Sequence, residues 1–181
     1  MRISNDNGRH YRLFQTSLGW AGVAATSRGI RAVVLPDKEK HAVERTLLSS
    51  LFGVGSSDGS ELLVALVLEK AVHVLQHCFA GERISFDLPL DLTSGTPFQQ
   101  AVWRAALQIP FGEVRSYAWA AKRIGNPRAS RAVGRALGAN PIPIIVPCHR
   151  VVRSAGGLGG YSGGLGLKRK LLDLEAHAHD R

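Results

Sequence analysis

The chain has 181 residues, with 23 Lys and Arg against 14 Asp and Glu, a formal net charge of +9 and a pI of about 10.3. This length suits one large domain or two small ones, and 45% hydrophobic residues are enough to form a core. The composition excludes a disordered chain and a collagen-like repeat. So basic a chain favours a polyanionic partner, nucleic acid first, because Lys and Arg release counterions from phosphates.

The apolar pattern predicts no membrane partner. The longest uninterrupted apolar run, Leu62 to Leu68, has seven residues, whereas a membrane-spanning helix needs roughly 18. The first eight residues lack the apolar segment of a secretory signal, so we expect a cytoplasmic protein. In a reducing cytosol Cys78 and Cys148 are expected to be free thiols.

The first part of the chain alternates strand and helix signals. Residues 14–35 predict two short strands joined by a turn at Ser27-Arg28-Gly29. A polar helix is expected from about Asp37 to Leu48, followed by a Gly/Ser linker from Gly53 to Ser60. Residues 61–80 contain no glycine or proline before Gly81, which predicts a largely buried helix with a glycine cap.

A change in composition near residue 93 marks a domain boundary. Residues 84–90 alternate apolar and polar side chains as a strand does, and the turn-rich residues 91–97 follow. We therefore expect an α/β domain over residues 1–92 and a second domain over residues 93–181.

The second domain is predicted to be mainly helical. One helix begins at Thr96 and Pro97 and presents apolar residues at spacings of four, three and four: Phe98, Val102, Ala105 and Ile109. A second helix is expected over about residues 116–124, and Asn126 is expected to cap a third over residues 128–139. Two short helices joined by a tight glycine-containing turn are typical of a helix-turn-helix.

The third predicted helix combines small residues with a row of arginines at positions 128, 131 and 135. Small side chains let a backbone approach another surface closely. The arginines can contact phosphates, and one of them can intercalate. The alternative interpretation is a solvated basic face over a core of Ala and Val.

Cys148 lies in residues 140–153, an apolar stretch stiffened by three prolines and unsuited to a surface loop. Burial raises the pKa of a thiol, so a reactive Cys148 needs a base or a positive neighbour, for which His149 and Arg150 are candidates. Adjacent side chains of an extended segment point to opposite faces, so a link from Cys148 to His149 would pass through a bend or a water. Alone, a Cys-His dipeptide is more often structural than catalytic.

Two other patterns do not predict binding sites. His73 and His77 are four residues apart with Cys78 beside them, but the segment lacks the glutamate of a zincin motif and an obvious third ligand. We therefore predict no metal. Residues 156–166 contain seven glycines but not the Lys and Ser/Thr of a phosphate-binding P-loop, which favours a flexible pocket wall.

Several motifs occur together in one order and spacing. Around the cysteine they are Asn140-Pro141, Pro147-Cys148-His149-Arg150-Val151 and Gly160-Tyr161-Ser162-Gly163-Gly164. Upstream they are Thr96-Pro97-Phe98-Gln99-Gln100-Ala101-Val102-Trp103, Phe111-Gly112-Glu113-Val114 with Ser116-Tyr117, and Gly125-Asn126-Pro127 with Arg131-Ala132-Val133-Gly134. With them, residues 84–175 resemble the O6-alkylguanine-DNA alkyltransferases (methylated-DNA–protein-cysteine methyltransferases). The first half is similar more loosely, through Leu18-Gly19-Trp20 and residues 29–35.

This resemblance implies a single-use repair enzyme that needs no cofactor. Cys148 would take a methyl or small alkyl group from O6 of guanine, with O4-alkylthymine left open, and keep it as a thioether that has no easy hydrolysis route. His149 would act on Cys148 as a water-mediated base, oriented by Glu175. Tyr117 would donate a hydrogen bond or proton to the departing guanine, and Asn140 would tie the turn to the site.

The resemblance also assigns residues to the base and to DNA. The alkylated atom lies inside the base stack, so the nucleotide must be flipped out, and Arg131 would fill the gap. The family places this helix in the minor groove, whereas a generic helix-turn-helix would use the major groove, and the residues alone do not decide between them. The other assigned residues are Tyr117, Tyr161, Ser162, the carbonyls of Cys148 and Val151, Arg128, Ala129, Gly134 and Arg135.

The family fold implies an N-terminal α/β domain that is ribonuclease-H-like, with a small antiparallel sheet, and a mainly α, winged helix-turn-helix C-terminal domain. The partner would be double-stranded DNA containing O6-alkylguanine. We expect a monomer, with cooperative assembly on DNA left open, that associates with the nucleoid when bound.

Two other functions are open at this point. A non-enzymatic relative could recognise alkylated DNA without repairing it, but such relatives lack the reactive cysteine, and Cys148 is present. A helix-turn-helix thiol sensor would favour a partner cysteine near Cys148, and none is close in sequence.

Overall fold

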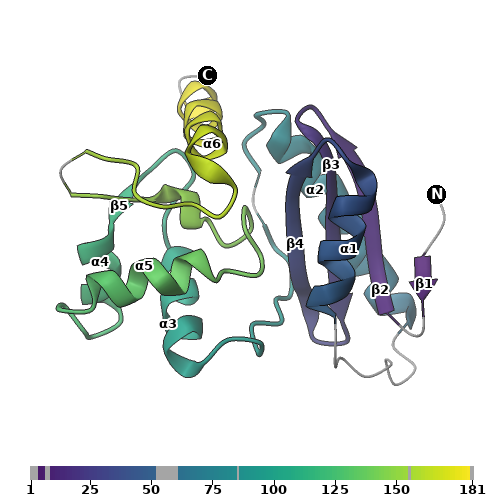
Figure 1. Ribbon diagram of the computed structural model, residues 1–181, viewed down its shortest axis with the longest axis horizontal. Helices are drawn as coiled ribbons and strands as arrows, with labels where there is room; N and C mark the ends of the chain where they lie inside the picture. Colours follow the sequence, from purple (N-terminus) through teal and green to yellow (C-terminus); the bar gives the residue numbers. More distant parts are fainter. Residues whose placement is uncertain (1–3, 7–8, 52–60, 85, 155, 180–181) are drawn as a thin grey trace. The chain divides into compact units, whose positions relative to one another are not determined.

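The structure, a computed structural model, describes residues 4–6, 9–51, 61–84, 86–154 and 156–179 (Figure 1). The linker predicted over residues 53–60 lies outside the described residues. The chain divides into two units, Met1–Leu92 and Thr93–Arg181. The first unit contains ten Lys and Arg and ten Asp and Glu, whereas the second contains 13 and 4. The whole net charge of +9 therefore belongs to the second unit.

The first unit contains a four-stranded antiparallel sheet whose strands follow chain order: β1 (Ser4–Asp6), β2 (Arg9–Thr16), β3 (Gly19–Thr26) and β4 (Gly29–Asp37). The β3–β4 pair confirms the predicted hairpin, with residues 27 and 28 as its turn. The strand predicted from residue 14 up to this turn was too long, because residues 17 and 18 form another turn that separates β2 from β3.

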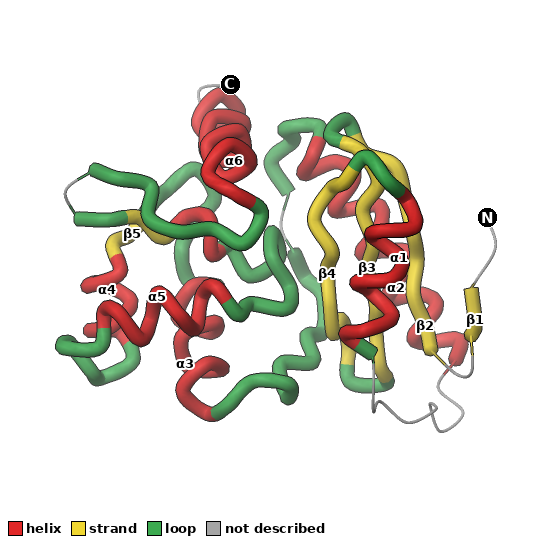
Figure 2. The backbone as a smooth tube through the Cα atoms, viewed as in Figure 1, coloured by secondary structure: helices red, strands yellow, loops and turns green. Residues whose placement is uncertain are grey.

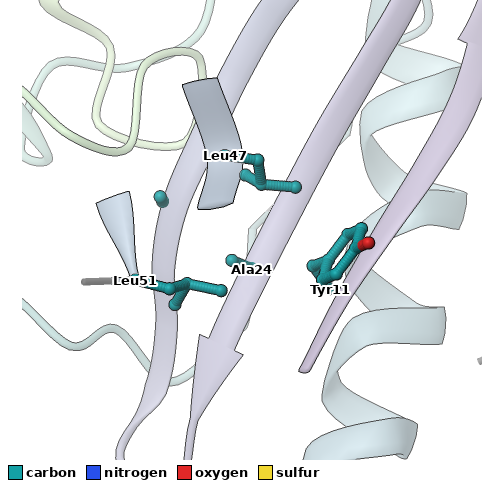
Figure 3. Packing of buried hydrophobic residues seen from close by; sticks show 5 residues of the cluster. Tyr11, Ala24, Leu47 and Leu51 are labelled. Carbon is teal, nitrogen blue, oxygen red and sulfur yellow. The ribbon is translucent and has the colours of Figure 1, made fainter. Parts of the chain in front are cut away.

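Two helices cover this sheet, α1 (Lys40–Ser50) and α2 (Glu61–Phe79). Neighbouring strand residues point to opposite faces. The Tyr11 hydroxyl donates to Glu44 on α1 at 2.8 Å, while Arg12 pairs with Glu69 on α2 at 2.8 Å. The helices therefore lie on opposite faces, as Figure 1 shows. Figure 3 shows the core under α1, which contains Tyr11, Ala24, Ala32, Leu47 and Leu51.

The prediction that α2 is largely buried was only half right. Its inner side packs on the sheet, but Leu62, Leu63 and Leu66 are 76%, 58% and 60% exposed. Among the described helices, α2 alone is long and apolar enough to cross a membrane, a test that core helices of folded domains also pass. Gly81 follows the helix with φ +86°, as expected of a glycine cap.

The strand predicted over residues 84–90 does not form in the described part of that segment. It contributes a single parallel bridge, between Leu90 and Ile30, with Ile30 donating to Pro89 O and Asp91 donating to Ile30 O. Pro89 has no N–H to extend the ladder. Asp91 is fully buried beyond this bridge and accepts from Thr26 at 2.9 Å.

The second unit is mainly helical, with only short stretches of strand (Figure 2). Its elements are α3 (Pro97–Ala106), β5 (Arg115–Ser116), α4 (Tyr117–Arg123), α5 (Ser130–Gly138), η1 (Cys148–Arg150), β6 (Val151–Val152) and α6 (Gly164–His179). Thr96 caps α3 in a reciprocal capping box with Gln99, which confirms the predicted start. The Trp103 indole N–H donates to Ala136 O at 2.8 Å and joins α3 to α5.

Two local predictions in this unit were wrong. The third helix begins at Ser130, and its N-cap is Ala129 rather than Asn126, because Ala129 N–H closes a separate turn on Asn126 O. Arg128 consequently precedes the helix. The segment around Cys148 is a turn of 3₁₀-helix rather than extended chain, so the alternation expected for Cys148 and His149 does not apply.

Candidate active site

Cys148 begins η1 and is 5% exposed. Cys78 and Cys148 form no disulfide, as predicted. The Asn140 side-chain amide donates to Cys148 Sγ at 3.1 Å and to Val146 O at 2.9 Å, and its oxygen accepts from Ile142 N–H at 3.0 Å. One side chain thus connects the sulfur to the turn that precedes it.

The turn before Cys148 is held in a strained conformation. Ile144 has φ +74°, a left-handed value that a β-branched residue rarely adopts. The residue is buried, and Val146 N–H donates to Ile142 O at 2.9 Å across the turn. Packing and these hydrogen bonds therefore fix the backbone that carries the sulfur.

The charge near the thiol comes from a residue that the sequence did not single out. Burial raises the pKa of Cys148, while the Asn140 amide and the Lys168 ammonium oppose the rise. Lys168 is fully buried on α6, donates to Val151 O at 2.6 Å, and has its pKa lowered by burial to about 8. A signal was present, because Lys168, Leu171 and Glu175 share one helical face, and this face is buried.

His149 and Glu175 form a buried pair. His149 Nε2 lies 2.7 Å from Glu175 Oε1. Burial lowers the pKa of His149, so the ring is neutral at pH 7. Burial alone would raise the pKa of Glu175, but hydrogen bonds from His149 and Arg150 bring it to about 2. An ionised Glu175 needs a donor, so the hydrogen is on Nε2, and Nδ1 keeps its lone pair.

Arg150 binds the Glu175 carboxylate of this pair rather than the Cys148 thiol. It donates to both carboxylate oxygens of Glu175, at 2.8 and 2.9 Å, and to Ile109 O at 2.8 Å. Its guanidinium also lies over the Phe111 ring, 5.5 Å from the centroid. Gly112 N–H is a further donor to Glu175, at 3.2 Å. Glu175 is therefore a connected core residue, 5% exposed, and not a solvated one near a helix end.

Tyr117 begins α4 and is packed between glycines. Its ring lies against Gly134 on α5, and a Cβ at Gly159 would collide with its hydroxyl. Burial raises the pKa of Tyr117, the Gly160 N–H and the Arg153 guanidinium oppose the rise, and the charge of Cys148 adds to it. The phenol therefore keeps its proton at pH 7.

A hollow of about 440 Å³ separates α5 from the loop after β6. Its wall is formed by Tyr117, Ser130, Arg131, Gly134, Arg135, Arg153, Gly159 and Gly160. The wall thus includes four predicted site residues and adds Ser130, Arg153, Gly159 and Gly160. Cys148 is not part of it.

The remaining predicted residues lie outside this wall. Tyr161 packs edge-on against His149, with ring centroids 6.5 Å apart. The carbonyls of Cys148 and Val151 already accept one hydrogen bond each, from Val151 N–H and Lys168. Arg128 and Ser162 are exposed, and Ala129 is half-buried.

The histidine pair of the first unit has other partners. The rings of His73 and His77 pack edge-on with centroids 4.3 Å apart, and His77 pairs with Glu82 at 2.8 Å. Within the described residues, no three His, Cys, Asp or Glu side chains form a group that could hold a metal ion.

Comparison with known families covers both units. Residues 9–92 match the family model described as "6-O-methylguanine DNA methyltransferase, ribonuclease-like domain", and residues 97–177 match its "DNA binding domain". The chain belongs to the 6-O-methylguanine DNA methyltransferase family. The expected fold class, a small antiparallel-sheet domain followed by a helical DNA-binding domain, is confirmed.

Relatives within this methyltransferase family include proteins of known structure. The Mycobacterium tuberculosis methylated-DNA–protein-cysteine methyltransferase is 59% identical over 105 residues, 58% of this chain and 63% of that protein. The alignment thus spans less than two thirds of that relative. A crystal structure of Mycobacterium tuberculosis OGT in complex with DNA is 40% identical, with a TM-score of 0.73 and 93% of each chain covered. The constitutive Bacillus subtilis enzyme is 51% identical over 109 residues, 60% of this chain and 66% of that protein.

Proposed function

We propose that this chain repairs DNA directly, by one irreversible transfer of a methyl or small alkyl group from O6 of guanine to Cys148. The observation that carries the proposal is the buried thiol of Cys148, hydrogen-bonded by Asn140 and next to the His149–Glu175 pair, in a chain of this family. The reaction takes place in the cytoplasm, on the nucleoid.

The transfer balances with no cofactor. The Cys148 sulfur forms a bond to the alkyl carbon, the bond from that carbon to O6 breaks, and guanine leaves with the electron pair. The thiol loses a proton and guanine gains one, so the products are an S-alkylcysteine and ordinary guanine. Because the thioether is stable, each molecule reacts once.

His149 removes the thiol proton through a water. Its Nδ1 carries the lone pair, is buried, and has no hydrogen-bond partner among the described residues. Glu175 fixes the ring orientation through Nε2 and stabilises the imidazolium once the proton arrives. Asn140 and Lys168 stabilise the thiolate.

Tyr117 assists the leaving group. Its protonated hydroxyl donates to guanine as negative charge develops on the ring. The carbonyls of Cys148 and Val151, each with one lone pair to spare, accept from the exocyclic amine, which favours guanine. Ser162 interacts near O6, and Tyr161 forms a wall of the base site.

DNA binds through α5 in the minor groove. The side chains buried on α5 are Val133, Ala136 and Leu137, while Arg131 and Arg135 are exposed. Arg131 fills the gap left by the flipped nucleotide, and Arg128, Ala129, Gly134 and Arg135 approach the backbone. A solvated basic face has the same pattern of burial, and the hollow beside Arg131 and Arg135 favours DNA binding over it.

The test is the intact mass of the protein after incubation with excess duplex containing one O6-methylguanine. We expect one added methyl group per molecule, mapped to Cys148 and absent from Cys148→Ala. An unmodified protein that binds the lesion tightly would reject repair in favour of recognition alone. DNA binding that depends on oxidant, without methylation, would indicate a thiol sensor.

A further inference from the structure

Arg153 is the arginine of the hollow that neither the sequence motifs nor the proposed chemistry uses. It follows β6, which pairs in parallel with β5 through Arg115↔Val151 and Ser116↔Val152. Tyr117 and Arg153 directly follow the last paired residues. Both line the hollow, and the charge of Arg153 acts on the Tyr117 phenol.

The backbone at Arg153 is held in place. Its N–H donates to Gly157 O at 2.8 Å, and Gly156 N–H donates to Arg153 O at 3.1 Å. The aliphatic part of the side chain lies along Gly157, where an added Cβ would come 3.4 Å from Arg153 Cδ. These contacts with Gly156 and Gly157 direct the side chain along the wall of the hollow.

The guanidinium of Arg153 makes no ion pair or side-chain hydrogen bond within the described part of the chain, although Arg115 nearby is paired with Glu113. Arg153 lines the same hollow as Arg131 and Arg135, and none of the described residues in its wall is an Asp or Glu. Three guanidinium groups around one space select an anion, and arginine binds phosphate through two parallel hydrogen bonds.

We propose that Arg153 binds a backbone phosphate of the flipped nucleotide and thereby holds that nucleotide against Tyr117. The inference rests on the proposed function. Arg131 enters the duplex from α5 and fills the gap in the base stack, while Arg153 binds the flipped nucleotide from the loop after β6. The two arginines therefore have different roles, one in the duplex and one on the nucleotide that has left it. Arg153 is a positioning residue and takes no part in bond making.

The experiment measures single-turnover alkylation of Cys148 by duplex containing O6-methylguanine, in which one phosphate flanking the lesion is natural or is an uncharged methylphosphonate. We expect Arg153→Ala to slow the natural duplex about tenfold, as loss of a charge-assisted hydrogen bond does. Arg153→Lys should recover part of the rate. When the methylphosphonate replaces the phosphate that Arg153 binds, whether 5′ or 3′ of the lesion, Arg153→Ala should react with that duplex as fast as the parent protein does.

Free O6-benzylguanine, which has no phosphate, separates phosphate binding from an effect on Tyr117. We expect Arg153→Ala to react with it at the parent rate. Arg169→Ala removes one exposed positive charge from the same unit, away from the wall of the hollow, and should leave all rates unchanged.

The role of Arg153 would be overturned if Arg153→Ala lost the same fraction of its rate on the natural duplex and on both methylphosphonate duplexes. It would also be overturned if the variant lost that fraction on free O6-benzylguanine, or if it lost no rate on the natural duplex. A parent protein that gains no methyl group would overturn the proposed function itself.

Discussion

Glu175 makes the stability of the second unit dependent on acid. Its pKa is about 2 in the folded protein against an ordinary 4.5, so the folded state favours the ionised form. This contribution is complete above pH 4.5 and disappears as the pH falls towards 2, and it amounts to about 3 kcal/mol. We expect Glu175→Gln to be less stable than the parent at pH 7, by about 3–5 kcal/mol, because Arg150 is left buried without its partner.

Urea unfolding at pH 7 and pH 3 measures this dependence. The stability gap between the parent and Glu175→Gln should narrow at pH 3, because the Glu175 carboxylate of the unfolded parent is then protonated while that of the folded parent is still largely ionised. A gap of the same size at both values would show that the carboxylate charge does not stabilise the fold.

Arg131 permits a test of base flipping that needs no structure of a complex. We expect Arg131→Ala to slow methyl transfer from duplex DNA at least tenfold while the reaction with free O6-benzylguanine stays near the parent rate, because the free base has no stack to leave. Single-turnover rates on both substrates give the answer. Equal losses on the two would remove Arg131 from the flipping step.

At the scale of elements, the glycine-rich loop after β6 forms one wall of the hollow and fits closely against Tyr117. Gly159 has φ +71° and leaves no room for a Cβ beside the Tyr117 hydroxyl, whereas Gly160 has open space around it. We expect Gly159→Ala to displace Tyr117 and lower the methyl-transfer rate at least tenfold, and Gly160→Ala to react like the parent. Rates on duplex and on free base should fall together. Equal behaviour of the two variants would mean that the loop moves freely.

The sequence predicted the elements whose signals are local. The helix from Pro97 was found because the cap and the apolar spacing lie within it, and the β3–β4 hairpin because its turn residues adjoin. The prediction of a strand over residues 84–90 was wrong because a strand needs a paired neighbour, and the described part of this segment forms only the bridge from Leu90 to Ile30. The α5 cap failed because Asn126 and Ala129 close a turn of their own.

The candidate site could be predicted from the sequence in its motif residues and not in the residues that surround them. Cys148, His149 and Tyr117 lie in recognisable patterns, so the resemblance located them. Lys168, which is fully buried, was missed because a lysine in a sequence normally signals exposure, although it shares one helical face with Leu171 and Glu175. Arg153 was missed because its nearness to Tyr117 depends on the β5–β6 register.

At the scale of the whole molecule, the two units divide the charge unequally, with ten of each sign in residues 1–92 and a net +9 in residues 93–181. We expect Arg135→Gln to reduce the salt dependence of affinity for undamaged duplex, measured as the slope of log K against log salt, by about one unit. Arg45→Gln, an exposed arginine of the first unit, should leave the slope unchanged. Equal reductions would mean that both units contact phosphates.

Because one unit is neutral and the other strongly basic, the charge of the chain is unevenly distributed, and the electric field of DNA would orient it. The field exerts a torque that turns the basic unit towards the duplex before the surfaces touch. On the proposed partner, collisions would therefore occur with the basic unit towards the duplex, and a larger share of them would begin a search along it. Under the proposed function, in which each repaired lesion consumes one molecule, this orientation would let a small number of molecules search a large amount of DNA.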